Sequence, residues 1–423
     1  MALPWWFAHI AQRIIGDTMN KSQQQVVAPP LEPHCAAPDR SEIARRVAAI
    51  RARMAELELD FYLCHDPVNV FYLTNFKNFV HERPFLVVIP ASGPLIFLMP
   101  KLEESHVRQR AVGDVEFVHY FEFPAPAGQM WSDRLLDVIR QGQRIGLEQQ
   151  CPLAIERVVE RLVERAAAGR TIVADIVEEV REIKSAFEIS RLAFTSHWLS
   201  QGHERLLAAA KPGSSVFALN SQIGGALVGE LVMQHPDVNV MACEAIAVAT
   251  PPSISHDPHL VPDIRTCLEE GGPHVTLVCG TANGYGAEVE RTFFLGHVPE
   301  AAVRPFHDML DARALAFELA VPGANMAEVD RRVTALLTAR GYGDKLLHRT
   351  GHSFGVTRHE GPYLADGHEH EIRPHMLFSI EPGIYLPGIG GFRFSDTVLI
   401  TETGNRCLTS APQTLQELTL PRA

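Results

Sequence analysis

Hydrophobic and polar residues alternate along this chain with two periodicities, one typical of a helix and one typical of a strand. Between residues 41 and 59 apolar side chains recur at helical spacing, and the serine that begins this stretch fits an N-cap. The apolar runs 85–89 and 95–98 are separated by a Pro-Ala-Ser-Gly-Pro turn, which predicts two paired strands. Further helices are predicted over 153–169 and 186–210. This mixture predicts an α/β layer.

Residues 1–40 differ from the rest of the chain. Residues 5–7 are Trp-Trp-Phe, but no basic segment precedes them and no small-residue cleavage site follows, so we expect no secretory signal. A glutamine run and the pair Pro29-Pro30 then indicate an irregular arm. Two interpretations stay open: the arm packs on a partner subunit, or Met19 is the true first residue.

Composition narrows the class of protein. A length of 423 residues favours two domains. Fifty acidic against 38 basic residues give a net charge of −12, which argues against a nucleic-acid partner. We read no apolar run as long enough to cross a bilayer, so no membrane partner is expected. Seven cysteines without paired spacing fit the reduced cytoplasm, where we expect the protein to act on a small-molecule substrate.

Four polar segments in the last quarter of the chain carry the most specific signal. They are Thr350–Gly355 (TGHSFG), Arg358–Pro362 (RHEGP), Phe378–Gly383 (FSIEPG) and Gly391–Asp396 (GFRFSD). These segments resemble the motifs of the prolidase, methionine aminopeptidase and creatinase family. The resemblance covers roughly residues 42 to 415 and is strongest after Ser255.

The resemblance implies an α/β (α+β) architecture with an arm at 1–40 and two domains. A creatinase/prolidase-type N-terminal domain is expected over 41–182, and a C-terminal catalytic domain with the pita-bread fold over 183–423. Inside the second domain a helix followed by Pro-Gly occurs twice, at 212–213 and 322–323, which fits the pseudo-twofold repeat of that fold. The resemblance also implies a homodimer.

Metallopeptidases of this family hold two divalent metals with two aspartates, a histidine and two glutamates. By alignment of the motifs, these five positions fall on Leu277, Glu288, His352, Glu381 and Ser395. Two hard cations about 3.5 Å apart need anionic oxygens between them, a leucine offers none, and a serine hydroxyl is a weak neutral ligand. We therefore predict a site without metal or other cofactor. The alternative is one divalent metal on Glu288, His352 and Glu381.

Creatinase keeps the same fold without metals, and two segments of this chain resemble it. In the segment 288–294 Glu290 matches the creatinase glutamate that binds the guanidinium of the substrate, and the segment 351–356 matches without a substitution. The segment around His259 resembles ectoine hydrolase, another member without the ligand set. By this resemblance His259 is the general acid/base, with His256 in reserve, and an imidazole pKa near 6.5 suits that role.

The other roles follow from the same resemblance. Glu290 and Glu381 would orient the substrate, and His352 would hold water or developing oxyanion charge. The catalytic residues are thus His259, His352, Glu381 and Glu290. Arg393 can grip a carboxylate, Tyr363 stands where creatinase has an arginine, and Arg83 follows a loop that in the family can reach a neighbour's active site. The expected substrate contacts are His359, Arg393, Tyr363, Glu288, Arg83 and His256.

These roles lead to one main functional prediction and two alternatives. Without a metal, Glu288, Glu290 and Glu381 make an acidic pocket that favours a cation. We therefore predict a creatinase-like, metal-independent hydrolase of a C–N bond (amidine, guanidine or amide) in a small zwitterionic or cationic substrate. The first alternative is an Xaa-Pro dipeptidase or aminopeptidase with a reduced metal site. The second is a non-catalytic pseudopeptidase that binds peptides.

Overall fold

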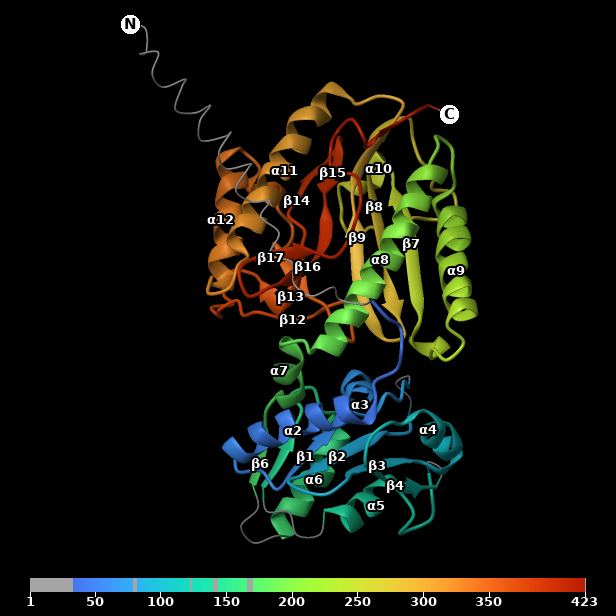
Figure 1. Ribbon diagram of the computed structural model, residues 1–423, viewed down its shortest axis with the longest axis vertical. Coiled ribbons are helices and arrows are strands. Elements are labelled where there is room, and N and C mark those ends of the chain that lie inside the picture. The colour runs from blue at the N-terminus through green and yellow to red at the C-terminus, as the bar shows by residue number, and fades with distance from the viewer. Residues whose placement is uncertain (1–32, 79–81, 122–123, 140–143, 166–169, 423) are drawn as a thin grey trace, which may run out of the picture. The chain divides into compact units, whose positions relative to one another are not determined.

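The computed structural model describes residues 33–78, 82–121, 124–139, 144–165 and 170–422. The chain from Pro33 onward forms one compact unit that holds two large sheets, blue to teal and yellow to red in Figure 1. Most of the predicted arm, together with Met19, lies outside the described residues. The predicted boundary after residue 182 falls in the short link between helix α7, which ends at Glu182, and helix α8, which begins at Ala186.

The first sheet has six strands in the order β4-β3-β2-β1-β5-β6. Its strands are β1 (Phe61–Cys64), β2 (Leu86–Pro90), β3 (Leu95–Pro100), β4 (Val115–Tyr120), β5 (Arg144–Leu147) and β6 (Arg170–Val173). The helices of this region are α2 (Arg40–Glu56), α3 (Pro67–Thr74), α4 (Glu104–Arg110), α5 (Trp131–Val138), α6 (Leu153–Arg165) and α7 (Ile176–Glu182). The predicted strand pair is confirmed, since β2 and β3 pair in antiparallel fashion.

The first predicted helix begins slightly earlier than its expected N-cap. Helix α2 starts at Arg40, and its N-cap is Asp39, whose carboxylate accepts the backbone N–H of Glu42 at 2.8 Å. Ser41 instead donates its hydroxyl to the same carboxylate at 2.7 Å. A carboxylate is the stronger acceptor at a helix N-terminus, which explains why the prediction of Ser41 as the cap was wrong.

The second sheet has ten strands and carries the motifs. Eight strands run in the order β12-β11-β13-β16-β9-β8-β10-β18, with β7 added on β8 and β17 on β16. The strands are β7 (Glu244–Thr250), β8 (Gly271–Ala282), β9 (Tyr285–Glu290), β10 (Thr292–Leu295), β11 (Gly351–Ser353), β12 (Glu360–Leu364), β13 (Leu377–Ile380), β16 (Ser395–Ile400), β17 (Asn405–Cys407) and β18 (Thr419–Leu420). A separate hairpin pairs β14 (Gly383–Leu386) with β15 (Gly390–Arg393).

Two helix pairs repeat the same plan around this sheet. The helices are α8 (Ala186–Ala209), α9 (Val216–Gln234), α10 (Pro252–Ser255), α11 (Glu300–Leu319) and α12 (Met326–Ala339). The pairs α8/α9 and α11/α12 are each joined by a Pro-Gly turn. The second helix of each pair is capped by a side chain, Ser215 or Asn325, and both caps form an isolated bridge, with Cys267 and Glu371. This repetition fits the predicted pseudo-twofold domain.

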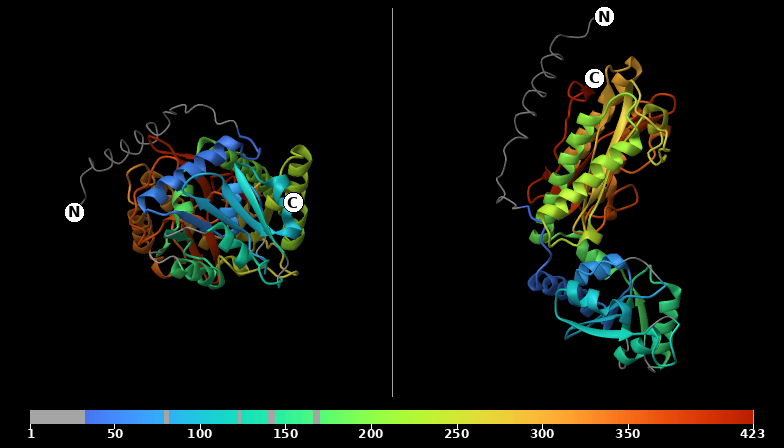
Figure 2. Two further views of the ribbon diagram at one scale, coloured as in Figure 1. Left: turned by 90° about the horizontal axis from the view of Figure 1, so that it is seen from below. Right: turned by 90° about the vertical axis from the view of Figure 1, so that its right-hand side faces the viewer.

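Helices α8 and α9 cover one face of strands β7 to β9, as both views show (Figures 1 and 2). Val278 and Val289 point into the core on that face and are fully buried. Successive side chains of a strand point to opposite faces. Glu288 and Glu290 therefore point to the other side of the sheet, away from α8 and α9.

Helix α9 corrects one expectation. Its 19 residues are long and apolar enough to cross a membrane by length and composition alone. In the fold, however, Val216, Leu219, Leu227 and Leu231 are buried in the core. Gly224 permits close packing on β7, because a Cβ there would lie 2.6 Å from the carbonyl oxygen of Ala245.

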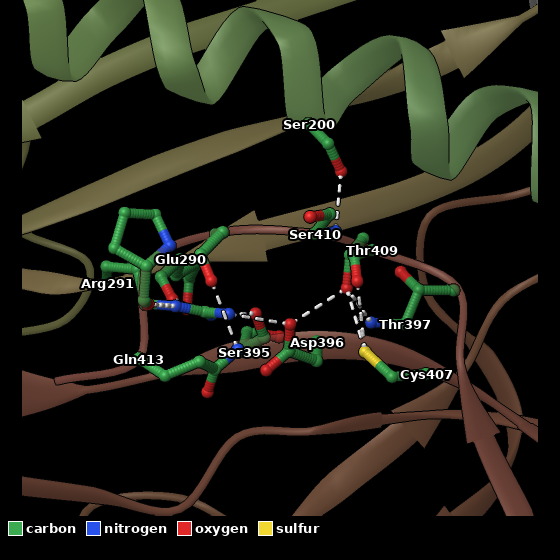
Figure 3. A network of polar contacts seen from close by, with 12 residues as sticks. Ser200, Glu290, Arg291, Ser395, Asp396, Thr397, Cys407, Thr409, Ser410 and Gln413 are labelled. Carbon is green, nitrogen blue, oxygen red and sulfur yellow. Dashed lines mark hydrogen bonds and ion pairs between the residues drawn. The ribbon is translucent and has the colours of Figure 1, made fainter.

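A buried polar network lies beneath the strands that carry the motifs (Figure 3). Arg291 donates to Asp396 at 2.9 Å, and both side chains are fully buried. Arg313 from α11 and the hydroxyl of Thr409 complete the shell around this carboxylate, at 2.5 and 2.8 Å. Arg291 also donates to the carbonyl of Glu290, at 2.7 Å, so the network fixes the end of β9.

Removing the buried anion should destabilise the fold strongly. In Asp396→Ala two arginines lose their counter-charge in a dry environment, and we expect the free energy of unfolding to fall by about 3–5 kcal/mol. Chemical denaturation followed by circular dichroism measures this change. Glu230→Ala is the matched control, because Glu230 forms an exposed ion pair with Arg205 at 2.8 Å and should matter little. Equal stability of the two variants would contradict this account.

The buried His203 should make stability fall in acid. It lies 3.0 Å from the hydroxyl of Thr276, and burial, helped by the charge of Arg291, lowers the pKa of His203 to about 3 from 6.5. Between these values the unfolded chain binds a proton that the folded chain excludes. Stability is therefore lost as the pH falls from about 6.5, by up to about 1.4 kcal/mol per pH unit.

The variant His203→Gln cannot take up this proton. We expect its thermal midpoint to fall less steeply with decreasing pH, between about 6.5 and 4.5, than that of the wild type. His375→Gln is the control, because His375 is exposed beside Glu402. Identical slopes for the wild type and His203→Gln would sink the prediction.

Candidate functional site

Strand pairing aligns the candidate residues in a row across the second sheet. Cys279 of β8 lies opposite Glu288 of β9. Thr397 of β16 joins the row by donating its hydroxyl to the carbonyl of Glu288 at 3.0 Å, and Ser379 of β13 lies opposite Thr397. His352 of β11 follows, because its backbone N–H donates to the hydroxyl of Ser379 at 2.9 Å. One face of the sheet thus presents this whole row.

A second row lies two residues along the same face. Glu290 of β9 is paired with Ser395 of β16, and the register of β8 and β9 sets Leu277 on the other side of Glu290. The hydroxyl of Ser395 donates to the carboxylate of Glu288 at 2.6 Å. Leu277 and Ser395 therefore lie beside the glutamates without adding a carboxylate, as the alignment of motifs predicted.

Three carboxylates crowd together at the centre of these rows. One oxygen from each of Glu288, Glu290 and Glu381 lies within 4.8 Å of the others. Burial and the nearby Glu381 raise the pKa of Glu288 to about 8. Burial also raises the pKa of Glu290 and of Glu381. Repulsion by a neighbouring carboxylate, Glu288 for Glu290 and Glu290 for Glu381, adds to this effect. Such a cluster holds its full negative charge only with a cation close by.

One cation belongs to the chain itself. The guanidinium of Arg393, at the end of β15, donates to Glu290 at 2.6 Å and to the hydroxyl of Tyr385 at 3.0 Å. A second contact joins Nε of Arg393 to the same carboxylate at 2.5 Å. The predicted grip of Arg393 on a substrate carboxylate stays a prediction, but this guanidinium is already engaged by Glu290.

His352 presents a free lone pair to the acidic cluster. Its Nδ1–H donates to the carbonyl of Ser353 at 3.0 Å, which leaves Nε2 unprotonated. That Nε2 lies 3.3 Å from Glu381, and no hydrogen-bond partner is found for it among the described residues. Burial lowers the pKa of His352 to about 3. The lone pair on Nε2 of His352 thus faces an oxygen of the Glu381 carboxyl group at this distance.

Local structure holds this histidine in place. Gly351 lets β11 approach β13, because a Cβ there would lie 2.1 Å from the carbonyl oxygen of Ser379. The ring of His359 stacks on the ring of His352 with centroids 3.6 Å apart. Nitrogen or oxygen atoms of Glu288, His352 and His359 also lie within 4.8 Å of one another. The structure therefore brings together five of the predicted residues: Glu288, Glu290, Glu381, His352 and His359.

The other two predicted histidines lie in the loop after α10. His259 is exposed, and its backbone N–H donates to Asp257 at 3.1 Å. Its charge contributes to the lowered pKa of His348 and of His359, which indicates that it lies near the cluster. His256 is half-buried and follows the end of α10.

Tyr363 and Arg83 have different surroundings. Tyr363 of β12 lies directly opposite His352 of β11, and the guanidinium of Arg349 lies 4.5 Å from the centre of its ring. Arg83 precedes β2 of the first sheet and forms an ion pair with Glu82 at 3.2 Å. Its reach into a neighbour's active site stays a prediction.

Three residues at the site were not predicted from the sequence. They are His348, Arg349 and Tyr385. His348 accepts the hydroxyl of Tyr385 at 2.7 Å and donates its other ring N–H to the carbonyl of Arg349 at 2.8 Å. Two of them could have been found by their position in the sequence, since His348 and Arg349 stand immediately before the segment that contains His352.

Comparisons with known proteins give relatives over most of the chain. The probable dipeptidase PepE of Mycobacterium tuberculosis (strain H37Rv) is 27% identical over 381 residues, which cover 89% of this chain and 97% of that protein. Two solved structures show the same fold. The dipeptidase PepE from Mycobacterium ulcerans has a TM-score of 0.75 at 24% identity, covering 91% of this chain and 100% of that one. A prolidase from Thermococcus sibiricus has a TM-score of 0.76 at 23% identity, covering 90% and 99%.

These relatives contradict the main functional prediction. They are named as dipeptidases and a prolidase, which supports the predicted hydrolase but not its creatinase-like, metal-independent form, so that part of the prediction is wrong. The names favour the first alternative, an Xaa-Pro dipeptidase. The structure supplies a physical reason. Glu290, which the prediction assigned to a guanidinium of the substrate, already binds the guanidinium of Arg393.

The prediction of a site without a cofactor is wrong as well. Residues 195–402 match metallopeptidase family M24. The prediction weighed the five family positions one at a time along the chain. It placed Glu290 and His359 in the same pocket but did not count them as side chains that could hold an ion together with Glu288, His352 and Glu381.

Domain matches complete the comparison. Residues 46–183 match the creatinase/prolidase N-terminal domain, ahead of the segment that matches the metallopeptidases. The predicted succession of a creatinase/prolidase-type α/β domain and a pita-bread catalytic domain is therefore confirmed, in agreement with the solved structures. The chain belongs to metallopeptidase family M24.

Proposed function

We propose that this protein is a metal-dependent peptidase that hydrolyses dipeptides, with Xaa-Pro dipeptides as its preferred substrates. One observation carries the proposal: the unprotonated Nε2 of His352 faces the carboxylate of Glu381 at 3.3 Å inside a buried acidic cluster. Two electron-rich atoms at this distance favour a cation that both can bind. The names of the relatives, dipeptidases and a prolidase, support the substrate class.

The donor set fits one divalent ion better than two. Glu288, His352 and Glu381 supply two carboxylates and an imidazole, which is a common set for a catalytic metal with an open position. A second ion would need the oxygens that Leu277 and Ser395 do not offer. Ser395 also donates its hydroxyl to Glu288, so it acts there as a hydrogen-bond donor and not as an anionic ligand.

Peptide hydrolysis forms one C–O bond and breaks the C–N bond, and the released amine must gain a proton. A bound divalent ion lowers the pKa of water and polarises the carbonyl group of the substrate. We assign Glu381, which remains slightly exposed beside His352, to take the proton from the attacking water. We assign His259 to protonate the leaving nitrogen, which its exposed position near His348 and His359 supports.

Location and assembly belong to the same proposal. We infer a cytoplasmic protein, because all seven cysteines are free thiols in the described part of the chain. A homodimer is proposed from the family resemblance alone.

The protein should bind one divalent ion per chain. Titration of chelator-treated protein with Mn²⁺ or Co²⁺ in a calorimeter should give a stoichiometry near one. In His352→Ala the imidazole ligand is lost, and we expect the affinity to fall by more than about 100-fold. His375→Ala is the control, because His375 is exposed beside Glu402. A stoichiometry of two, or unchanged affinity in His352→Ala, would contradict the single-ion site.

Metal should be required for turnover of a dipeptide. We expect hydrolysis of Gly-Pro to cease in chelator and to return when Mn²⁺ or Co²⁺ is added back. In Glu381→Gln the base is lost, and kcat should drop by about 100-fold or more. Glu402→Gln, an exposed glutamate on a loop, serves as the control. Chelator-resistant cleavage of Gly-Pro would refute the proposed mechanism.

A further inference from the structure

Arg349 stands out among the arginines of the catalytic domain. It lies between His348 and the start of β11 and is half-buried. Its guanidinium lies over the ring of Tyr363, 4.5 Å from the centre, and its Nε is buried without a hydrogen-bond partner among the described residues. Aromatic stacking positions a guanidinium but leaves its N–H groups unpaired.

Neighbouring arginines at the site all have acidic partners. Arg393 binds Glu290, Arg291 binds Asp396, and Arg358 lies 3.7 Å from Glu244. Within the part of the chain that the structure describes, no ion pair is found for Arg349. An arginine that is positioned by an aromatic ring beside a catalytic cluster, without a direct ion pair among the described residues, is suited to bind an anionic group of a ligand.

The charge of Arg349 acts on the cluster itself. It contributes to the lowered pKa of His352 and of His359, and it opposes the raised pKa of Glu381. Tyr363, which lies under its guanidinium, is paired directly with His352 across β11 and β12. Side chains paired in this way have Cβ atoms about 5 Å apart. Arg349 therefore lies beside the strand pair that carries His352, and its charge acts on both His352 and Glu381.

From this geometry we propose that Arg349 binds the free α-carboxylate of the substrate and thereby selects dipeptides. An extended dipeptide spans at most about 7 Å. When its scissile carbonyl lies beside His352 and Glu381, its terminal carboxylate can reach Arg349. A longer peptide would bring an uncharged amide to the same place and leave the guanidinium unpaired. This inference rests on the proposed function, since it specifies the substrate of the same site.

Paired substrates test the inference directly. Gly-Pro and its C-terminal amide differ only in the charge that Arg349 would bind. We expect the metal-loaded wild type to prefer Gly-Pro by at least about 10-fold in kcat/KM. In Arg349→Met the KM for Gly-Pro should rise by about 30-fold or more with little change in kcat, while kcat/KM for the amide stays unchanged. Arg349→Lys should restore part of the preference.

Arg373→Met is the matched control, because Arg373 is exposed and forms its ion pair with Glu182, at 3.1 Å. It should leave both substrates unaffected. An equal loss for Gly-Pro and the amide in Arg349→Met would overturn the inference and assign Arg349 to support of the fold. Equal cleavage of both substrates by the wild type would overturn it as well.

Binding without turnover separates this inference from the proposed function. Calorimetry should show that the wild type binds proline more tightly than prolinamide, and that Arg349→Met loses this difference. If the wild type cleaves neither substrate but keeps this preference, the proposed function fails while the carboxylate site stands. If proline and prolinamide bind equally to the wild type, the role of Arg349 is refuted whatever the enzyme cleaves.

Discussion

The catalytic domain depends on one buried ion pair, Arg291 with Asp396. Burial of either charge alone would cost several kcal/mol, so the two must remain together for the sheet to form as it does. Arg291 precedes β10 and Asp396 lies in β16, so the pair connects strands from the two halves of the repeat. Arg291 also donates to the carbonyls of Glu290 and Ser395, at 2.7 and 3.1 Å. The charge that stabilises the core therefore also sets the spacing of the strands that present the acids.

The charges of the acidic cluster must also be balanced. Three buried carboxylates cannot all stay ionised without positive charge nearby. Arg393 neutralises Glu290 from within the chain, and the remaining pair, Glu288 and Glu381, faces the lone pair of His352. In the proposed site, the absence of carboxylates at Leu277 and Ser395 thus reduces the number of ions that can be held from two to one. A reduced set of ligands and an internal cation together explain a metallopeptidase fold with an incomplete motif.

The sequence predicted most of the architecture because its signals are local. The strand pair at 85–89 and 95–98, the helix at 186–210 and the two domain types could be read from periodicity and contiguous motifs. The motifs also named the residues of the acidic cluster, but not the contacts among them, because these depend on strand register between segments up to about a hundred residues apart. Glu290 could be placed two residues after Glu288 by the motif, but only the fold shows that its carboxylate already binds the guanidinium of Arg393. Arg349 escaped for the same reason, since its missing partner is visible only in three dimensions.

The bond between Arg393 and Glu290 has a consequence for how the protein survives fluctuations in metal supply. A metal ion exchanges with its surroundings, whereas a guanidinium is covalently part of the chain and cannot be withdrawn. When the ion departs, one of the three carboxylates keeps its counter-charge, and mutual repulsion is confined to the other two. Without the ion, this pocket therefore has less internal electrostatic repulsion than a pocket whose carboxylates are balanced by two ions. In the proposed single-ion site, loss of the ion should therefore stop turnover without unfolding the sheet that carries the ligands.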